Sequence, residues 1–220
     1  AMGYTFNLYD FTFILKGVGI TIVLCSITMI LSLAAAFLIG IFRALQSNII
    51  VVRVVKQALT VLIGVLRGTP LMLQLMFLFF GLPFVGVNLS PTTAAVLGLS
   101  VYSTAYLAEI VRTGIESIAK DQWDGAAALG FSYLQTMQAV ILPQAVRIMI
   151  PPTVSFFLGL IKDSSLCAVI GFVELARAGR MIVEKTHESL LVFSVVALLY
   201  FLICYPISRV SQRLEKQLES

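Results

Sequence analysis

Residues 68–108 read GTPLMLQLMFLFFGLPFVGVNLSPTTAAVLGLSVYSTAYLA, a run of 41 residues without one charged side chain. A membrane-spanning helix needs about 20 mostly apolar residues, because it rises about 1.5 Å per residue and the hydrocarbon core is about 30 Å thick. The run is therefore too long for one crossing and suits two. Residues that end or bend helices divide it: Gly81, Pro83, Gly86, Asn88, Ser90 and Pro91. The pattern predicts membrane spans at residues 62–85 and 92–111.

The composition of the whole chain also indicates a membrane protein. Of its 220 residues, 59% are apolar and 12% are charged, against about 45–50% and about 25% in soluble domains. The mean hydropathy is +0.99. These values exclude a soluble globular domain, a disordered chain and a nucleic-acid-binding protein. We therefore expect membrane lipid around the chain and no nucleic acid as a partner.

Three more apolar stretches predict spans. Residues 17–42 include 26 residues without a charge, and residues 189–208 include 20. The stretch 146–170 is apolar at both ends but has a polar interruption at residues 162–165, and we interpret it as one crossing with a break in the helix. The sequence thus predicts an all-α membrane protein with five transmembrane helices, which form a single transmembrane domain over residues 1–220.

The distribution of Lys and Arg predicts the orientation of the chain, because cytoplasmic segments carry an excess of these residues. With the N-terminus outside, the cytoplasmic segments hold ten of the fifteen positive residues: Arg43, Arg53, Lys56, Arg67, Arg112, Lys120, Arg147, Arg209, Arg213 and Lys216. The outer segments hold Lys16, Arg177, Arg180 and Lys185, and Lys162 lies within a span. We therefore expect the N-terminus outside and the C-terminus inside.

The chain offers few residues for metal or catalytic chemistry. Its three cysteines, Cys25, Cys167 and Cys204, are too few and too scattered for a disulfide framework or a metal site. The single histidine, His187, has no Cys or carboxylate at metal-ligand spacing. The sequence contains no HExxH and no G-x-S-x-G motif. We expect no metal, no cofactor in this chain and no enzymatic activity of its own.

The largest hydrophilic segment, residues 113–143, lies between the third and fourth predicted spans. Asp121 can cap a short helix, and Gly130 can adopt the left-handed conformation that ends it. The sequence between them is rich in small residues, with the large apolar Trp123 and Phe131 on either side. Small residues on every face let another backbone approach closely, although an Ala-rich helix is also an ordinary feature of a structured loop.

A second short helix is predicted directly after the first. Ser132 and Gln135 have the spacing of a capping box, in which each side chain bonds the other residue's backbone N–H. Pro143 has no backbone N–H and is expected to end this helix. Two short helices joined at a glycine therefore protrude into the cytoplasm.

At this loop the sequence resembles the permease subunits of binding-protein-dependent ABC importers. Their motif is E-A-A, three residues, G, nine residues and I-x-L-P. Here it reads Asp124-Gly125-Ala126, then Gly130, then Val140-Ile141-Leu142-Pro143, with the same spacing. The departures are Asp for Glu, Gly for the first Ala and Val for Ile, all of them conservative in size or charge.

Further segments resemble the polar amino acid branch of this family, which carries histidine, arginine, glutamine and similar substrates. They are Arg67-Gly68-Thr69-Pro70 with Gln74, Tyr106-Leu107-Ala108-Glu109-Ile110-Val111-Arg112, Gln122-Trp123-Asp124, Ile141-Leu142-Pro143-Gln144-Ala145, and Lys162-Asp163-Ser164-Ser165-Leu166. Together the resemblance covers nearly the whole chain from Lys16 onward.

The resemblance implies a MetI-like five-helix bundle in the bacterial cytoplasmic (inner) membrane. It also implies partners: a second permease subunit, identical or homologous, ABC ATPase subunits and an extracytoplasmic amino acid-binding protein. The chain has no G-x-x-x-x-G-K-[ST] phosphate loop, so ATP and Mg are expected on the partner ATPase. The hydrophilic loop is the expected ATPase-coupling element, through Trp123, Asp124, Gly125, Ala126, Ala127, Gly130, Leu142 and Pro143.

Four successive polar residues interrupt the fourth span. They are Lys162, Asp163, Ser164 and Ser165. A charge at mid-bilayer costs about 2.5–3.5 kcal/mol on insertion scales, so it needs a partner or a wet cavity. We interpret the run as a broken helix lining a substrate pathway, with a helix end at the membrane interface as the alternative. Asp163 would meet an ammonium group or a cationic side chain, and Ser164, Ser165 and free backbone N–H groups would hold a carboxylate. Tyr102 and Thr104 are candidates for the opposite wall or for ordinary packing.

Four other charged residues are interpreted as parts of a gate or as structural. They are Arg67, Glu109, Arg112 and Glu174. Glu109 and Arg112 are three residues apart and so share one helix face. Arg67 can either extend to lipid phosphates or pair with a carboxylate on a neighbouring helix. Glu174 begins an amphipathic segment of mixed charge on the outer side, where a binding protein docks or an outer gate lies.

The preferred function is the permease subunit of an ATP-driven importer that moves polar amino acids by alternating access. One alternative is an ATP-independent channel or secondary transporter with Asp163 and Glu109 as an ion relay, which would need no docking loop and would have inverted repeats that the sequence does not show. Another is an ABC permease for a different small polar substrate. Dependence on ATP and on an associated ATPase separates the first alternative from the preferred function.

Overall fold

The structure, a computed structural model, describes residues 5–45 and 48–219, which form a helical bundle without a strand. Its longest helices are α1 (Leu8–Ala44), α4 (Pro91–Glu116), α7 (Leu142–Asp163) and α9 (Ser189–Glu219). The shorter helices are α2 (Ile50–Gly68), α3 (Leu71–Met76), α5 (Lys120–Ala128), α6 (Tyr133–Thr136) and α8 (Leu175–Thr186). The prediction of an all-α protein is confirmed.

Four turns of a different helical type extend these helices. Two are π-helical, η1 (Phe77–Gly81) and η3 (Met137–Ile141). Two are 3₁₀-helical, η2 (Leu82–Val85) and η4 (Ser164–Ile170). Because η3 joins α6 to α7 without a loop and η4 follows α7 directly, the helix is continuous over residues 133–170.

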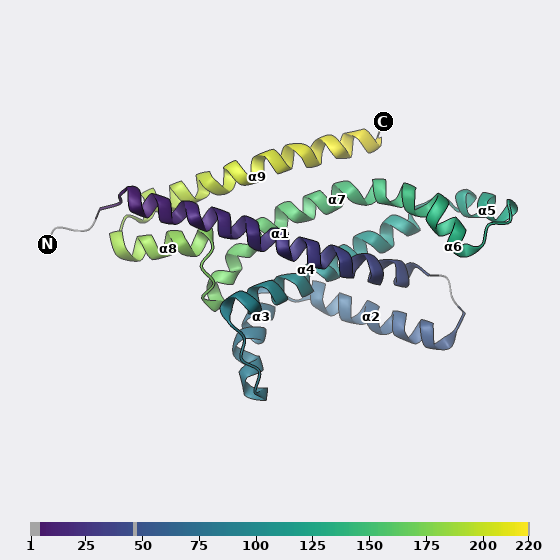
Figure 1. The fold of residues 1–220 in the computed structure, drawn as a ribbon, viewed down its shortest axis with the longest axis horizontal. Helices are drawn as coiled ribbons and strands as arrows, with labels where there is room; N and C mark the ends of the chain where they lie inside the picture. Colours follow the sequence, from purple (N-terminus) through teal and green to yellow (C-terminus); the bar gives the residue numbers. More distant parts are fainter. Residues whose placement is uncertain (1–4, 46–47, 220) are drawn as a thin grey trace.

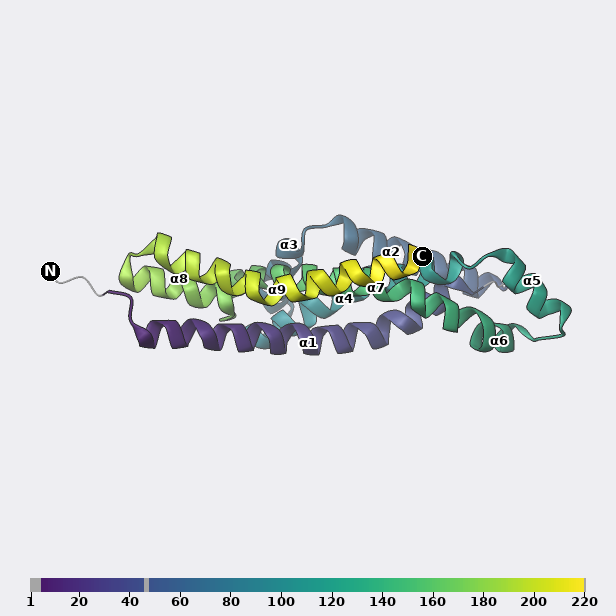
Figure 2. The same cartoon turned by 90° about the horizontal axis from the view of Figure 1, so that it is seen from above.

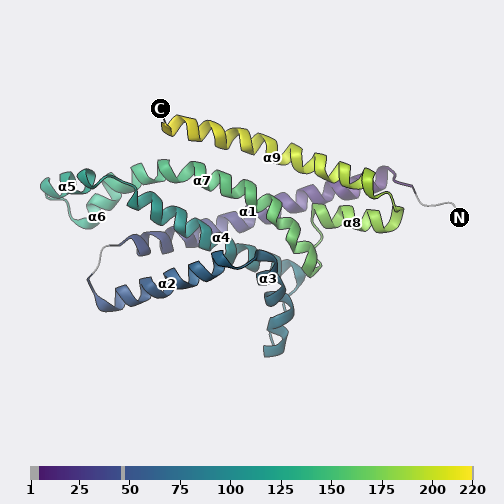
Figure 3. The same ribbon diagram turned by 180° about the vertical axis from the view of Figure 1, so that it is seen from behind.

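The two ends of the bundle carry different elements (Figure 1). The start of α1 and α8 lie at one end, and α5 and α6 lie at the other end, beyond the last turn of α1 (Figure 2). The C-terminus of α9 points toward the end with α5 and α6. Seen from behind, α3 and the turns that follow it leave the bundle as a separate arm (Figure 3).

Four helices among the described residues are long and apolar enough to cross a membrane. They cover residues 8–44, 91–116, 133–170 and 189–217. The predicted spans at 17–42, 92–111, 146–170 and 189–208 fall within them. The bent pair formed by residues 50–68 and 71–85 gives a fifth crossing if it is counted as one span.

The stretch 62–85 is not one straight helix. The chain bends by 103° between α2 and α3. The bend lies at Thr69, whose backbone is extended at φ −109° and ψ 143°. The ring of Pro70 disfavours the helical conformation for the residue before it, which ends α2 and starts α3 in a new direction.

Close contact between helices depends on small residues at the centre of the bundle. A Cβ atom at Gly40 of α1 would lie 2.5 Å from the Val111 Cβ atom of α4. At Gly17 it would lie 2.9 Å from the Leu175 Cα atom of α8. Without a driving force from water, membrane helices associate largely through such close packing. The two glycines therefore fix α1 against α4 at one level and against α8 at the other.

The first short helix of the hydrophilic loop begins earlier than predicted. Its N-cap residue is Ala119, without a capping side chain, and Asp121 lies inside the first turn of α5. The prediction that Asp121 caps this helix is therefore wrong, because buried Ile118 packs against the end of α4 and places the N-cap two residues earlier. Gly130 ends the helix with φ +81°, as predicted.

The second short helix starts as predicted but does not end where expected. Ser132 and Gln135 form the capping box in both directions. Pro143 does not stop the helix, which continues through α7. The reason is the π turn η3 before it, in which the Leu142 N–H donates to the carbonyl of Met137, five residues earlier. Pro143 therefore lies in the first turn of α7, where a residue without a backbone N–H is tolerated.

Candidate functional site

The loop of α5 and α6 is a rigid hairpin at the end of the bundle. The rings of Trp123 and Tyr133 stack with centroids 5.8 Å apart, joining the two helices. At its base, the Gln144 side-chain amide donates to the Gln122 side-chain oxygen at 3.1 Å. Trp123 also packs on the buried cluster formed by the end of α4 and the η3 turn. The hairpin is therefore anchored to α4 and α7.

The outer surface of this hairpin is small and exposed. Asp124, Gly125 and Ala127 are exposed, whereas Ala126 is buried toward α6. A Cβ atom at Gly125 would meet no other atom within 4 Å. At the tip, Leu129 is 77% exposed. An exposed apolar tip beside a face of small residues suits contact with another protein.

The other residues assigned to coupling take different positions. Gly130 is exposed at the turn between the helices, and Pro143 is exposed on the first turn of α7. Leu142 is half-buried against the cluster below the hairpin. The sequence motif thus combines residues that form the surface with residues that support it.

One glutamate near the end of α4 contacts arginines from three helices. Glu109 accepts from the Arg43 Nη1 atom of α1 at 2.7 Å and from the Arg112 Nη2 atom of its own helix at 2.5 Å. The Arg67 Nη1 atom, at the end of α2, lies 3.8 Å from the same carboxylate. Arg112 also pairs with Glu116. We call Glu109, Arg43, Arg67 and Arg112 the arginine cluster.

The members of the arginine cluster differ in burial. The Arg43 side chain is 4% exposed and has a further partner in the Thr60 hydroxyl of α2, whereas the Arg67 side chain is 40% exposed. The Arg67 guanidinium stacks over the Tyr106 ring, 5.2 Å from its centroid. Of the two alternatives for Arg67, contact with a carboxylate on a neighbouring helix is the one that the structure contains.

The polar run of the fourth span lies where α7 changes to a 3₁₀ helix, so the helix changes type there but is not interrupted as predicted. The Ser164 hydroxyl donates to the Ile161 carbonyl and the Ser165 hydroxyl to the Lys162 carbonyl, each at 2.7 Å. Ser164 is buried, Asp163 is half-buried and Lys162 is exposed. In the part of the chain that the structure describes, neither charge has an ion pair within 4 Å. We call residues 162–165 the polar break.

Aromatic side chains connect the polar break with the arginine cluster. Tyr102 and Tyr106 of α4 contact each other at 4.7 Å between centroids, and Phe156 of α7 stacks on Tyr106 at 5.6 Å. Tyr102 is also within electrostatic range of Asp163. Thr104 is half-buried two residues from Tyr102, about 200° around the helix. Tyr102 and Thr104 therefore face different directions and do not form one wall.

Glu174 is fully buried at the start of α8. Its carboxylate accepts from the backbone N–H groups of Ala176 and Arg177, at 2.7 and 2.8 Å, and from the Tyr200 hydroxyl of α9 at 3.0 Å. The Leu175 N–H donates to the Thr21 hydroxyl of α1 at 3.2 Å. These contacts hold α8 between α1 and α9.

The described residues contain no group of three or more His, Cys, Asp or Glu side chains placed to hold a metal ion. The three cysteines are buried and unpaired with one another. The chemistry of the site therefore consists of charges, hydroxyls and aromatic faces, arranged along helices that are long enough to cross a membrane.

Comparison with known proteins identifies the family. Residues 36–220 match the family described as "Binding-protein-dependent transport system inner membrane component". The chain belongs to this permease family. It is therefore a multi-pass inner-membrane transport subunit of the ABC type and not an enzyme, and the family resemblance stated from its loop motif is confirmed.

Individual relatives match most of the length of this permease. It is 37% identical over 205 residues to the "Probable amino-acid ABC transporter permease protein YckA" of Bacillus subtilis, covering 91% of this chain and 88% of the relative. It is 41% identical over 161 residues to the "Glutamine transport system permease protein GlnP" of Escherichia coli, covering 72% and 74%.

Solved structures share the fold of this permease. The chain aligns with a TM-score of 0.85 and 28% identity to the "Crystal structure of an amino acid ABC transporter with histidines", covering 97% of this chain and all of the other. It aligns with a TM-score of 0.76 and 16% identity to an inward-facing MetNI methionine ABC transporter, covering 95% and 99%. The prediction of a MetI-like helical fold is confirmed.

Sequence reasoning missed three residues of the permease site. Arg43 contributes to the cytoplasmic charge count, but 66 residues separate it from Glu109 and no local spacing predicts their contact. For Tyr106 the available signal is its i, i+4 spacing from Tyr102, which places both rings on one helix face. Phe156 is one of many apolar residues in its helix, and nothing in the sequence distinguishes it from the others.

Proposed function

We propose that this permease moves polar amino acids into the cell by alternating access. Energy comes from ATP and Mg bound on separate ABC ATPase subunits, and substrate comes from an extracytoplasmic amino acid-binding protein. A second permease subunit, identical or homologous, completes the pathway. The observation that carries the proposal is the anchored α5–α6 hairpin: α5 presents an exposed face of small residues, and α6 begins the helix that continues to the polar break.

The hairpin is the ATPase-coupling element of this proposal. Its exposed face of Asp124, Gly125 and Ala127 is small enough for a groove of another protein to close around it. Trp123, stacked on Tyr133, keeps that face rigid, so that movement of a partner is passed to α4 and α7 and not absorbed within the loop. The same reasoning orients the chain with the hairpin and C-terminus inside and the N-terminus and α8 outside.

The polar break and the aromatic side chains beside it are the proposed substrate pathway. An amino acid carries an ammonium and a carboxylate, and both must be met when it leaves water. Asp163 is a half-buried carboxylate without an ion pair among the described residues, so it is available for the ammonium or a cationic side chain. Lys162, exposed beside it, is available for the carboxylate. Tyr102 and Tyr106 supply the apolar side of the pathway.

The names of relatives support the substrate class. Relatives in Bacillus subtilis and Escherichia coli are described as amino-acid and glutamine permeases. A closely similar structure comes from an amino acid ABC transporter with histidines. The common feature of these substrates is the α-amino acid group, which is the group that Asp163 and Lys162 are suited to bind.

The test is purification of the tagged permease from its native membrane in mild detergent, with mass spectrometry of the proteins that remain bound. We expect a stoichiometric ABC ATPase. Replacement of Ala127 or Asp124 by Trp, on the exposed face of α5, should remove it. Gln212→Trp, on the exposed tail of α9, adds the same bulk elsewhere and should leave it bound.

Transport by the purified complex in liposomes then tests the energy source. We expect uptake of labelled amino acids only with ATP and the binding protein. A permease that purifies alone and moves substrate without ATP contradicts the proposal. An ATPase that remains bound to the Ala127→Trp and Asp124→Trp variants contradicts the role of the hairpin while leaving the importer function in place.

A further inference from the structure

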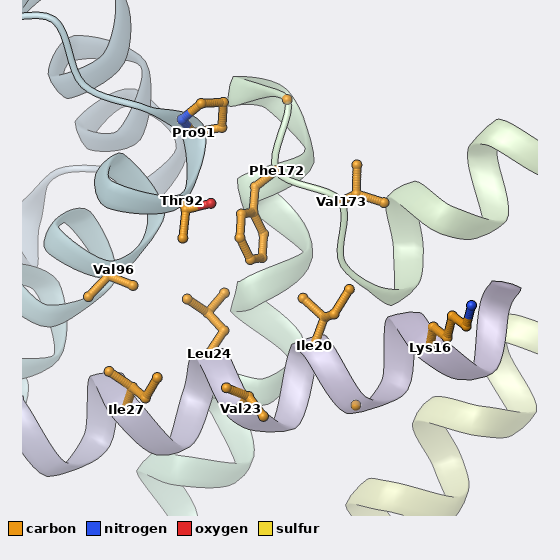
Figure 4. Close-up of a pocket in the computed structure, with 12 residues that line it drawn as sticks. Lys16, Ile20, Val23, Leu24, Ile27, Pro91, Thr92, Val96, Phe172 and Val173 are labelled. Carbon is orange, nitrogen blue, oxygen red and sulfur yellow. The ribbon is translucent and has the colours of Figure 1, made fainter.

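An apolar groove of about 880 Å³ runs along α1 near the end of the bundle that carries α8 (Figure 4). Its floor is one face of α1, from Lys16 to Ile27. Thr92 and Val96 of α4 lie on one side of it, and Phe172 lies across from α1, with Ile20 and Leu24 pointing toward its ring. The volume is within the usual range for small-molecule sites, about 300–1,000 Å³.

The charge of the groove is confined to its rim. Lys16 is exposed, extends its amine toward the N-terminal end of α1 and has no ion pair within 4 Å in the part of the chain that the structure describes. The next charged residue along α1 is Arg43, so residues 17–42 place Lys16 and Arg43 near opposite surfaces of the hydrocarbon. Lys16 therefore lies at the level of the lipid headgroups.

The length of the groove matches half of the bilayer. From Lys16 to Ile27 the helix advances 11 residues, which at about 1.5 Å per residue is about 16 Å. Half of a hydrocarbon core of about 30 Å is about 15 Å. An occupant that places a negative group at Lys16 and fills the groove must therefore be apolar over the depth of one leaflet.

We propose that this groove is a binding site for one phospholipid of the leaflet nearest the N-terminus, with its phosphate at Lys16 and an acyl chain along Ile20, Val23 and Ile27 between α1 and Phe172. Lysine near the end of a membrane helix meets phosphate at the interface, and the apolar lining meets the chain. The groove contains no residue of the arginine cluster or the polar break, and lipid binding in it does not depend on the proposed transport cycle.

The test measures phospholipid retained by the assembled transporter. The complex is purified in detergent, incubated with phosphatidylglycerol, purified again and analysed by mass spectrometry for lipid bound per permease. Lys16→Gln removes the charge, and Gly19→Leu fills the groove from its floor. A Cβ atom at Gly19 meets no other atom within 4 Å, so the added side chain starts in open space. We expect a several-fold loss of retained lipid for each.

Two matched controls separate this site from general lipid contact. Gly64→Leu, on α2, adds the same side chain where a Cβ atom is equally unopposed. Arg180→Gln removes an exposed charge from α8 on the same end of the bundle. Both should retain as much phosphatidylglycerol as the unchanged protein. Equal retention by all four variants overturns the proposal.

A photo-crosslinking amino acid at Ile20 gives an independent test in native membranes. We expect lipid adducts that decrease with Lys16→Gln. Adducts with a second permease or a binding protein, without lipid adducts, overturn the proposal and assign the groove to a protein interface. Because both measurements read lipid and not transport, they are separate from a failure of the proposed importer function.

Discussion

The arginine cluster and the polar break both place charges on membrane-spanning helices, but they treat those charges differently. In the arginine cluster, Glu109 has two arginines within 2.7 Å and a third at 3.8 Å. In the polar break, Asp163 and Lys162 have no ion pair within 4 Å among the described residues, and only the serine hydroxyls are satisfied by backbone carbonyls. Removing one partner of a buried pair destabilises a bundle, whereas a charge without a partner is available to a ligand.

The largest effect is expected from Glu109→Gln, because it leaves the buried Arg43 guanidinium without its counter-charge. Breaking a buried pair in this way costs about 3–5 kcal/mol. The measurement is the temperature at which the detergent-purified complex loses its monodisperse form. Glu116→Gln, on the exposed end of the same helix, is the control and should change it little. Equal behaviour of the two variants would show that the cluster does not stabilise the bundle.

Unlike Glu109→Gln, Asp163→Asn should change the thermal stability of the complex little and reduce transport strongly. A charge-assisted hydrogen bond to substrate contributes about 1.5–3 kcal/mol, which corresponds to about a 10- to 100-fold loss of uptake at low substrate concentration. Uptake by proteoliposomes measures this. Glu184→Gln, on the exposed face of α8, should transport normally. A normal uptake rate for Asp163→Asn would remove this residue from the pathway.

Ser164→Ala tests whether the polar break also has a structural part. The Ser164 hydroxyl is buried and bonds the Ile161 carbonyl at the end of α7, so its loss should destabilise the bundle by about 1 kcal/mol. Ser165→Ala removes the equivalent bond from a half-buried position and should cost less. Thermal stability of the two variants decides the order, and a larger loss at Ser165 contradicts it.

The smallest effect is expected from Arg67→Gln. Its contact with Glu109 is long and its side chain is 40% exposed, so the ion pair contributes less than about 1 kcal/mol. The same thermal measurement applies, with Arg43→Gln as the comparison in which a buried member of the cluster is lost. If Arg67→Gln were as destabilising as Arg43→Gln, the burial of each arginine would not determine how much it contributes to stability.

Much of the fold could be predicted because the bilayer limits the choice of structure. Charge-free stretches located the long helices, and the Ser132–Gln135 spacing and Gly130 located features of the loop that depend on local backbone chemistry. The predictions at Asp121 and Pro143 were wrong because the cause in each case lies outside the residue's own capping or helix-breaking chemistry. In one case packing of Ile118 shifted a helix start, and in the other a π turn accommodated the proline.

The candidate site was less predictable than the fold. The pair of Glu109 and Arg112 follows from helix periodicity, but the most buried partner, Arg43, comes from another helix. Tyr102 and Thr104 were grouped by polarity, although an interval of two residues separates them by about 200° around a helix. Pairing across helices depends on how the helices pack, and a single sequence contains no direct record of that packing.

The continuous helix over residues 133–170 has a mechanical consequence. Its 38 residues extend about 57 Å at about 1.5 Å per residue, far more than the membrane core. Near its middle, a Cβ atom at Gly114 of α4 would lie 2.6 Å from the Met149 Cγ atom, so the two helices cannot move closer there. That contact is a fulcrum, and Met149 lies 16 residues from Tyr133 and 14 from Asp163. We expect a helix that pivots on this contact to act as a lever with arms of nearly equal length, so that a sideways push on the hairpin swings the polar break by a similar distance in the opposite direction. Pro151 and Pro152, two and three residues beyond Met149, are the positions at which the helix would bend instead. Distances between spin labels at the two ends of this helix and labels on α4, with and without nucleotide, should change with opposite sign.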